Sequence, residues 1–566
     1  MSAADSPAPP AASPIAPVDV VGRHGRLVRR TALISVLTLM SRIIGFVRES
    51  LAASIFGHAS PINDAFVTAW RVPNLFRSLL GEGAMSTSLQ TAITRADAQQ
   101  GLEAGRALFH AIVRVVSWIL VGLCAVVMIA VHFMPDAMPI TGFAWLGDHP
   151  AEVRELTVRM MPFVVFVCLS AVASGALNVR GHFVSPSLAP VVMNLWWITA
   201  LFIVAREFGW SRAPGVGDAQ EWQRQMQMTR WLAWFVLGAG LILVLVQLPA
   251  LKAKGLLSRP KSVPGDALVA SNEHVWMVLK TSAPLAMGAA VYQVNVMVDG
   301  FMAVSLLPNG GPTALYYATR IQQFPMSLVS IAATSAVFPA LTALGQQRAL
   351  REVRALHDRT HLAIAFVAIP ATIGLLLFAE PVVSVCFEHG AFGPEGVVRG
   401  GSALRFLTLA ILPAGAAGLV ARTFYALGDF KTPVRISILM LVSNVVLNVV
   451  LVAGFGMDVG GVALATALTA CGNLALLWPG LRRRLGLPQG ERNLLRRLVA
   501  ITAAALVAGL VARGTYDFAL YAGGPHRALA LLAAIALCIS VYALVSHGLR
   551  IPEWHHLIGR LRRPRA

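Results

Sequence analysis

Charged residues interrupt several apolar stretches of the chain, and their types suit the binding of an anionic group. The segment SRIIGFVRES (residues 41–50) contains two arginines and a glutamate, and DAFVTAWRVPNLFRSLL (residues 64–80) contains an aspartate and two more arginines. A guanidinium stays charged at any relevant pH, and its planar fork of donors matches the oxygens of a phosphate. We therefore interpret one group as candidate residues for binding a phosphate or diphosphate: Arg42, Arg48, Glu49, Asp64, Arg71, Arg77 and Arg320.

Helical spacing places these residues on common faces. Arg42 and Glu49 are seven positions apart, as are Asp64 and Arg71, so each pair shares one face of a helix. A charged side chain at bilayer depth costs a few kcal/mol or more, and such residues usually face a water-filled cavity or a partner. With five arginines against two carboxylates, a cavity lined by this group would be cationic. In the alternative interpretation, the arginines reach from helix ends to the interface and pair with the two carboxylates to hold helices together.

Transmembrane helices are the elements that must position these residues. Of the 566 residues, 56% are hydrophobic and 13% are charged, which is less charge than the surface of a soluble domain needs. A hydrocarbon core about 30 Å thick requires roughly 20 apolar residues per helix. By this measure the chain is an all-α polytopic membrane protein with about fourteen spans, which begin near residues 32, 62, 107, 153, 184, 229, 275, 312, 361, 397, 434, 459, 494 and 526.

The basic residues indicate an orientation in the membrane and do not suggest a nucleic-acid partner. The net charge of +19 is concentrated in alternate loops, as the positive-inside rule describes. Both termini are therefore expected in the cytoplasm, with residues 1–30 as a disordered tail and residues 551–566 as a basic tail. The five cysteines are scattered singly through apolar spans, so neither a disulfide nor a zinc site is expected.

A weak internal repeat divides the spans into two groups. AFVTAWRV at residue 65 resembles ALYYATRI at residue 314, which aligns Arg71 with Arg320 at an offset of 249 positions. ALNVRGHFVSP resembles YALGDFKTP, which aligns Pro186 with Pro433 at an offset of 247. The similar offsets predict two parallel-repeat six-helix lobes, an N-lobe at residues 31–255 and a C-lobe at residues 270–485, followed by two additional helices at residues 490–550. Such lobes suit alternating access to a site between them.

Four motifs resemble those of one family of membrane transporters. SRIIGFVRES, DAFVTAWRVPNLFRSLLGEGAMS, YYATRIQQFP and FYALGDFKTP are similar to motifs of the MurJ (MviN) lipid II flippases, in the multidrug/oligosaccharidyl-lipid/polysaccharide exporter superfamily. The resemblance implies two lobes around a central cationic cavity, and a groove along the last two helices for a lipid tail. It also implies transport of lipid II, an undecaprenyl-diphosphate-linked peptidoglycan precursor, to the outer leaflet of the bacterial cytoplasmic (inner) membrane for cell wall synthesis.

The resemblance also assigns roles to individual residues. The arginines that matter in the family match Arg42, Arg48, Arg77 and Arg320, and its cavity aspartate matches a residue of the second motif, Asp64. Where many members have an aspartate after the second arginine of the first motif, this chain has a glutamate, residue 49, which keeps the charge on a longer side chain. Lipid II and membrane lipids are the implied partners, and the sequence does not indicate a protein partner.

A second polar group could couple transport to an ion. No Walker A sequence occurs, so the energy is expected from an ion gradient, the membrane potential or consumption of the product. Asp299 lies within the apolar segment VYQVNVMVDGFMAV, and Asn444 and Asn448 are four positions apart on one helix face. Their oxygens suit a hard cation such as sodium. The resemblance implies a sodium site that adds Thr466, although this chain lacks the second carboxylate found in some members. In the alternative interpretation, these side chains only form hydrogen bonds between packed helices.

Other classes of protein would share some of these sequence features. A flippase for another polyprenyl-diphosphate-linked saccharide would present the same diphosphate. A cation-coupled multidrug exporter of the same superfamily would share the two lobes, but arginines repel organic cations. A membrane enzyme that acts on a lipid-linked diphosphate would need a base, nucleophile or metal cluster, and neither HExxH nor GxSxG occurs. A scaffolding protein would not need charges at bilayer depth. We therefore predict a transporter rather than an enzyme.

Overall fold

The structure is helical wherever it describes a regular element. It is a computed structural model that describes residues 20–58, 60–81, 84–136, 144, 146–211, 218–258, 293–334, 337–486, 491–522 and 526–562. Within these ranges the regular elements are α-helices and two short π-helical turns, which confirms the predicted all-α class. Helix α1 already begins at Val20, inside the predicted N-terminal tail, and residues 1–19 lie outside the described residues.

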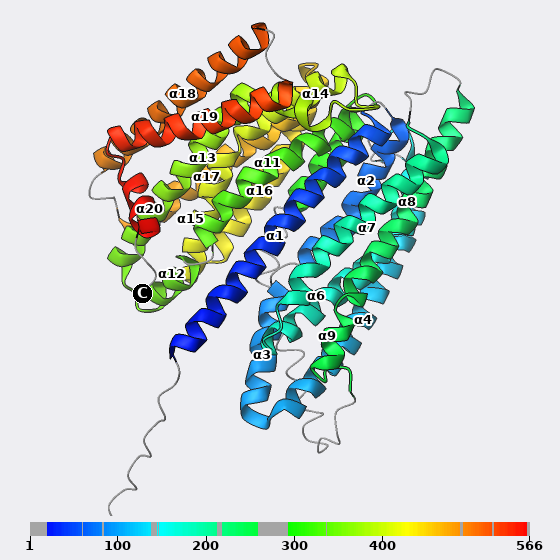
Figure 1. Ribbon diagram of the computed structural model, residues 1–566, viewed down its shortest axis with the longest axis horizontal. Coiled ribbons are helices and arrows are strands. Elements are labelled where there is room, and N and C mark those ends of the chain that lie inside the picture. The colour runs from blue at the N-terminus through cyan, green and yellow to red at the C-terminus, as the bar shows by residue number, and fades with distance from the viewer. Residues whose placement is uncertain are drawn as a thin grey trace, which may run out of the picture.

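The N-terminal group of helices forms one bundle, drawn in blue to green in Figure 1. Its elements are α1 (Val20–Phe56), α2 (Pro61–Phe76), the π-turn η1 (Arg77–Gly81), α3 (Ala84–Gln100), α4 (Leu102–His132), α5 (Pro150–Met160), α6 (Phe163–Val179), α7 (Val184–Phe208), α8 (Ala219–Leu245) and α9 (Leu248–Ala253). Figure 1 shows α1 running between this bundle and the next, and α1 packs mainly on α7. We call this bundle the N-lobe.

A second bundle, the C-lobe, follows in the chain and is drawn in green to orange. Its first described helix runs from Gln293 to Leu306. Its further elements are α11 (Gly311–Thr334), α12 (Val337–Gln346), α13 (Leu350–Phe387), α14 (Pro394–Thr408), α15 (Ile411–Ala426), α16 (Lys431–Val449), the π-turn η2 (Val450–Gly454) and α17 (Val459–Leu485). The chain then continues through α18 (Glu491–Tyr521), α19 (Arg527–Gly548) and α20 (Pro552–Arg562), so a helix also occupies part of the predicted basic tail.

Ten segments of the described residues are long and apolar enough to cross a membrane. Three of them are each made of two consecutive α-helices, α5 with α6, α8 with α9, and α14 with α15. Helices α1, α2 and α11 and the helix Gln293–Leu306 correspond to four further expected spans but are not among the ten. α1 contains three charged candidate residues, and α2 has only 16 residues. The expected start near residue 275 lies outside the described residues, so the count of about fourteen stays a prediction.

Local sequence signals explain where α2 begins and ends. This helix belongs to the N-lobe, and some of its side chains contact the C-lobe. Ser60 caps the helix by accepting a hydrogen bond from the Asn63 backbone N–H at 3.1 Å, and Pro61 occupies the first turn. Pro73 lies inside the helix, where it has no N–H to donate, and the helix ends in the π-turn that begins at Arg77. The proline and the π-turn therefore interrupt the regular α-helical geometry at the end of α2.

The lobes meet closely at the end of the molecule where α1 ends. The Ala391 backbone N–H donates to the Ser54 carbonyl at 2.8 Å, and the Ser50 hydroxyl donates to the Cys386 carbonyl at 2.6 Å. Gly57 has a φ of +71°, and a Cβ at this residue would lie 2.6 Å from the Ala391 carbonyl oxygen. Both the backbone conformation and the close approach therefore require glycine here. We call this region the closed end.

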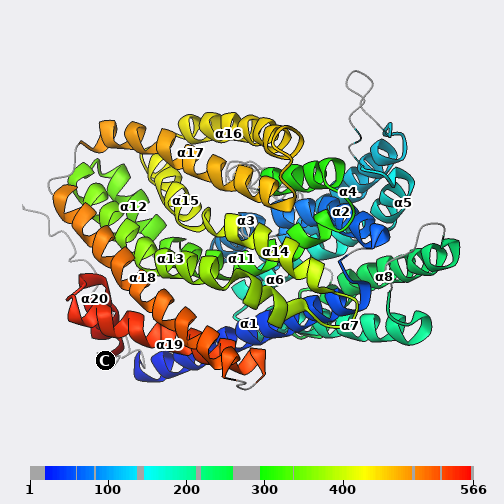
Figure 2. The ribbon, with the colours of Figure 1, turned by 90° about the horizontal axis from the view of Figure 1, so that it is seen from above.

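Helices α18 and α19 lie together along the outside of the C-lobe, as the view in Figure 2 shows. They pack on α13, which departs from helical geometry at Phe378. Because Pro381 has no N–H, the Leu377 carbonyl lacks its usual helical donor. The Arg513 guanidinium donates to this carbonyl at 2.7 Å and so anchors α18 to the kink.

Gly509 allows α18 to approach α13, and replacing it should separate the two helices. A Cβ here would lie 2.8 Å from Leu377 Cδ1 and 3.1 Å from Ile373 Cγ2. We expect Gly509→Leu to lower the free energy of unfolding by about 1–3 kcal/mol, as overpacking usually does. Thermal unfolding of the purified protein in detergent measures the change. Gly514→Leu is the matched control, because no heavy atom lies within 4 Å of a Cβ there. Equal melting temperatures for the two variants would contradict the packing argument.

Candidate functional site

A cavity of about 600 Å³ lies between the two lobes and contains most of the predicted binding residues. Its charged lining residues are Arg42, Arg48, Glu49, Arg77 and Arg320, which carry a net charge of +3. Much of the remaining wall is aromatic or aliphatic, and includes Phe66, Trp70, Phe163 and Trp197. Apolar walls lower the local dielectric and strengthen the field of the arginines. The cavity therefore combines a cationic lining with little competing solvent on its apolar sides.

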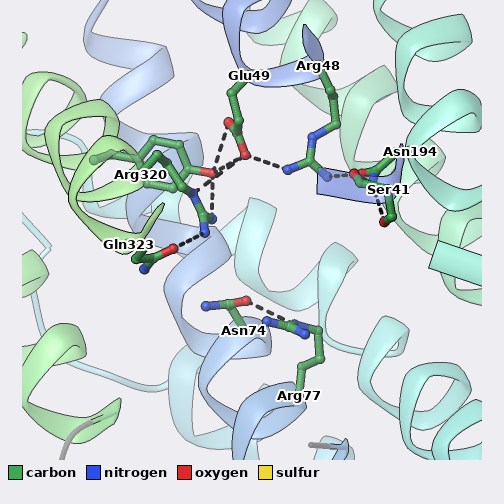
Figure 3. Close-up of polar contacts among 9 residues, drawn as sticks. Ser41, Arg48, Glu49, Asn74, Arg77, Asn194, Arg320 and Gln323 are labelled. Atoms are coloured by element: carbon green, nitrogen blue, oxygen red, sulfur yellow. Dashed lines mark hydrogen bonds and ion pairs between the residues drawn. The ribbon is translucent and has the colours of Figure 1, made fainter. Parts of the chain in front are cut away.

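Glu49 is the carboxylate that joins the arginines of the two lobes (Figure 3). It is buried on α1, where it pairs with the neighbouring Arg48. Arg320 reaches it from α11 of the C-lobe, with 3.5 Å between Arg320 Nε and Glu49 Oε1. Tyr316 donates its hydroxyl hydrogen to Glu49 at 3.3 Å and accepts a hydrogen bond from Arg320 at 2.9 Å. One carboxylate thus serves two guanidinium groups, and a positive excess is left.

Neutral side chains orient the arginines. Asn194 on α7 accepts from Arg48 at 3.0 Å and donates to the Ser41 carbonyl at 3.0 Å. The Asn74 side-chain oxygen accepts from Arg77 Nε at 3.1 Å, and Gln323 accepts from Arg320 at 3.2 Å. Figure 3 shows these groups converging from α1, α2, α7 and α11. These partners fix the direction of each guanidinium without cancelling its charge.

Arg42 lies nearer the rim of the cavity and links the lobes. Its side chain is exposed, and it donates to the Ser327 hydroxyl on α11 at 2.5 Å. Arg42 and Glu49 line the same cavity, as two residues on one helix face can. Glu49 forms its ion pairs with Arg48 and Arg320.

Asp64 does not line this cavity and pairs with none of its arginines, which differs from the expected grouping of Asp64 with them. The carboxylate is buried at the closed end and accepts from the Gly310 N–H at 2.6 Å, the Thr313 N–H at 2.9 Å and the Thr313 hydroxyl at 2.6 Å. Gly310 and Thr313 mark the start of α11, so an N-lobe carboxylate caps a C-lobe helix. The partial positive charge of a helix N-terminus favours this arrangement.

Arg71 also points away from the central cavity and towards the C-lobe. It lines a second cavity, of about 260 Å³, together with Asp299, Asn295 and Thr466. Its guanidinium donates to the Val296 carbonyl at 3.2 Å. Arg71 and Asp64 do share a face of α2, as the sequence predicted, but that face is turned to the C-lobe. A role for either residue in binding the substrate stays a prediction.

The four residues predicted as a sodium site converge beside the second cavity. Thr466 donates to Asp299 Oδ2 at 2.9 Å, and Asn448 donates to Asp299 Oδ1 at 3.4 Å and to Asn444 at 3.0 Å. Asn295, which sequence analysis missed, donates to Asp299 Oδ2 at 3.4 Å. Its spacing of four from Asp299 was the available signal. Among the described residues no group of three or more His, Cys, Asp and Glu side chains could hold a metal, so a cation here would depend on neutral oxygens.

Sequence analysis also missed the neutral partners in the central cavity. Tyr316 stands in the quoted motif YYATRIQQFP, four positions before Arg320, and that spacing could have identified it. Asn74 precedes Arg77 by three positions and offered the same signal. Asn194 lies on α7, far from the arginines in sequence, and no local pattern connects it to Arg48.

Two helical lobes around a charged cavity, with ten described segments long and apolar enough to cross a membrane, are typical of a polytopic membrane transporter. Comparisons with known proteins identify the family. A sequence profile described as "Lipid II flippase MurJ" matches residues 52–526. The chain is 31% identical over 524 residues to the lipid II flippase MurJ of Burkholderia cenocepacia, covering 92% of this chain and 96% of that protein. It is 30% identical over 546 residues to a probable lipid II flippase MurJ of Vibrio cholerae, covering 93% and 97%. The chain belongs to the lipid II flippase MurJ family.

Solved structures agree with this fold. A structure of lipid II flippase MurJ in an inward closed conformation matches with a TM-score of 0.67 and 21% identity, covering 93% of this chain and all of that one. An inward-facing multidrug resistance MATE transporter of the MOP superfamily matches with a TM-score of 0.61 and 15% identity, covering 82% and 99%. The fold of this chain is therefore similar to those of both transporters.

Removing the Asp64 carboxylate should loosen the closed end. Asp64→Ala would lose three hydrogen bonds to the start of α11, and hydrogen bonds to charged groups each contribute about 1.5–3 kcal/mol. In a variant without the native cysteines, Ser54→Cys and Ala391→Cys should crosslink across the closed end. We expect Asp64→Ala to lower the crosslinking rate about tenfold or more.

Thr68→Ala is the matched control for this experiment. Thr68 is buried on the same helix, one turn from Asp64, and its hydroxyl makes no hydrogen bond. Crosslinking that is as fast in Asp64→Ala as in Thr68→Ala would show that the cap does not hold the lobes together.

Proposed function

We propose that this protein is a lipid II flippase, which moves the undecaprenyl-diphosphate-linked peptidoglycan precursor from the inner to the outer leaflet of the bacterial cytoplasmic membrane. Membership of the family supports the reaction, and the chain is a transporter rather than an enzyme. The observation that carries the proposal for this chain is the cationic cavity between the lobes, where four arginines face one carboxylate.

The arginines bind the diphosphate of the substrate. Arg48 and Arg320 already share Glu49, so they are held in place before the ligand arrives and need little reorganisation. Arg77 and Arg42 add donors on other sides of the cavity. Bidentate contacts from these groups replace the hydration shell that the diphosphate loses when it enters the membrane. The sugars and the peptide occupy the remainder of the space between the lobes.

Transport proceeds by alternating access of this cavity to the two leaflets. The contacts at the closed end exclude one side of the membrane. With the N-terminus in the cytoplasm, the closed end is the outer one and the cavity loads from the inner leaflet. The polyprenyl tail stays in lipid, beside the packed helices α18 and α19 on the outside of the C-lobe. Rocking of the lobes breaks the contacts at the closed end and presents the head group outside.

Two related functions share parts of this site. A flippase for another polyprenyl-diphosphate-linked saccharide would use the same arginines and differ in its contacts to the sugars. The two-lobe fold alone is also that of multidrug transporters. The net positive lining disfavours the organic cations that such exporters carry, and it therefore supports an anionic substrate.

Sodium is the candidate coupling ion, and the second group of residues suits it. Asn448 Oδ1 is buried and accepts no hydrogen bond, and it stands beside the Asp299 carboxylate, which is only 8% exposed. Asp299, Asn444, Asn448 and Thr466 would supply oxygens, as hard cations prefer. A bound sodium ion would neutralise the carboxylate in this buried place. Gradient-driven or potential-driven rocking then requires that the two conformations differ in affinity for the ion.

Replacing either Arg42 or Arg320 by alanine should abolish transport without loss of folded protein. We expect lipid II in the outer leaflet to fall to background in cells whose own flippase is depleted. An externally added enzyme that cleaves only exposed lipid II measures it. Arg320→Lys should restore part of the activity, because lysine keeps the charge but lacks the planar fork. Arg405→Ala is the control, since Arg405 pairs with Glu380 at 3.0 Å and does not line the cavity. Normal cleavage with either alanine variant would reject the cavity assignment, and no cleavage with well-expressed wild type would favour another saccharide carrier.

Asp299→Asn should remove any dependence of transport on sodium. The substitution keeps the size of the side chain and removes the only carboxylate of the predicted site. Initial rates of lipid II exposure, measured with sodium replaced by choline at constant ionic strength, report the dependence. A response to sodium that is unchanged in Asp299→Asn would show that these residues only pack the C-lobe helices.

A further inference from the structure

Arg71 is an N-lobe side chain that occupies space in the C-lobe. It projects from α2 and lies against the first helix of the C-lobe, between Val296 and Gly300. A Cβ on Gly300 would stand 2.3 Å from Arg71 Cδ, Nε and Cζ, so the guanidinium lies flat on the helix where glycine leaves room. The absence of a side chain at Gly300 is thus what admits Arg71 to this position.

The guanidinium approaches Asp299 but does not pair with it. Both side chains line the second cavity, yet they form no ion pair in this structure. Arg71 Nε and one terminal nitrogen are buried without a hydrogen-bond partner, which is costly for a charged group. The carboxylate instead accepts hydrogen bonds from Asn295, Asn448 and Thr466. The position of Arg71 is therefore set by packing and by the Val296 carbonyl, and its charge acts on Asp299 without a direct ion pair.

The internal repeat gives Arg71 a counterpart. Arg320 lies 249 positions later and pairs with Glu49, and Asp299 lies 250 positions after Glu49. Arg320 and Glu49 thus form one pair across the lobes. Arg71 is the counterpart of Arg320, and Asp299 lies one position beyond the counterpart of Glu49. The first pair is formed, whereas the second is held apart. A carboxylate whose equivalent arginine is close but unpaired is available for another cation.

We propose that Arg71 is the coupling residue between the ion site and the movement of the lobes, because its fixed charge competes with sodium for Asp299. The inference rests on the proposed sodium site. While the closed end is formed, Arg71 is held beside Asp299 and weakens the binding of a cation there. Asp64, seven residues earlier on the same face of α2, is part of the closed end, so rocking that opens this end also withdraws Arg71. Asp299 is then free to bind the ion, and this difference in affinity links the ion to the outward movement.

Equilibrium binding of radioactive sodium to the purified full-length protein tests the competition, with choline keeping the ionic strength constant. Arg71→Gln removes the charge, and we expect sodium to bind about tenfold or more tightly. Gly300→Ala keeps the charge but displaces the flexible side chain, and it should tighten binding in the same direction. Arg71→Lys should stay near wild type. Arg405→Gln is the control for the loss of one positive charge elsewhere in the C-lobe.

A conformational measurement gives an independent readout. By reciprocity, sodium should slow crosslinking between Ser54→Cys and Ala391→Cys at the closed end in a background that keeps Arg71, and it should have little effect in the Arg71→Gln background. Equal sodium affinities for wild type, Arg71→Gln and Gly300→Ala would overturn the inference and leave the sodium site standing. If wild type, Arg71→Gln and Gly300→Ala bound no more sodium than Asp299→Asn, both the competition and the sodium site would be overturned. Tighter binding in the two variants that is lost with Asp299→Asn would establish the competition.

Discussion

The cost of placing guanidinium groups inside a membrane is the constraint on which the central part of this protein depends. A single carboxylate, Glu49, joins Arg48 of the N-lobe to Arg320 of the C-lobe, and it does so at the depth where water is scarce. Its contacts satisfy part of each arginine, and amide and hydroxyl groups satisfy more of them without adding negative charge. The lining therefore stays positively charged, and an anionic ligand can neutralise the excess positive charge.

Helix α2 and the π-turn that follows it place three charged residues in three different regions. Asp64 and Arg71 are seven residues apart and share one face, which is turned to the C-lobe. Arg77 follows Arg71 by six residues, beyond Pro73 and at the π-turn, and it lies on the other side, in the central cavity. The closed end, the second cavity and the central cavity are thus connected through one short helix. A rigid movement of α2 changes all three together.

The sequence predicted the composition of these sites better than their boundaries. Charge at bilayer depth identified Arg42, Arg48, Glu49 and Arg320, because a charged side chain is costly there unless it faces a cavity or a partner. Helical periodicity also predicted that Asp64 and Arg71 share a face. Periodicity does not reveal which neighbour covers a face, and so both residues were grouped with the central cavity, which neither of them lines. Their role in binding the substrate stays a prediction. Asn194 was not predictable for the same reason: its contact with Arg48 arises from the packing of α7 on α1, which no local pattern encodes.

The repeat explains why these two spaces resemble each other and yet differ. Asp64 contacts Thr313, its own counterpart at the offset of 249, so equivalent positions of the two lobes meet at the closed end. Arg320 of the C-lobe extends towards the N-lobe and pairs with Glu49. Arg71 of the N-lobe extends towards the C-lobe and lines the second cavity together with Asp299. Gly300 leaves room for Arg71 beside Asp299, but the Asp299 carboxylate accepts its hydrogen bonds from Asn295, Asn448 and Thr466 instead. The two arginines at equivalent repeat positions, Arg320 and Arg71, therefore belong to two different sites. The site of Arg320 and Glu49 suits an anion, and the site of Arg71 and Asp299 suits a cation.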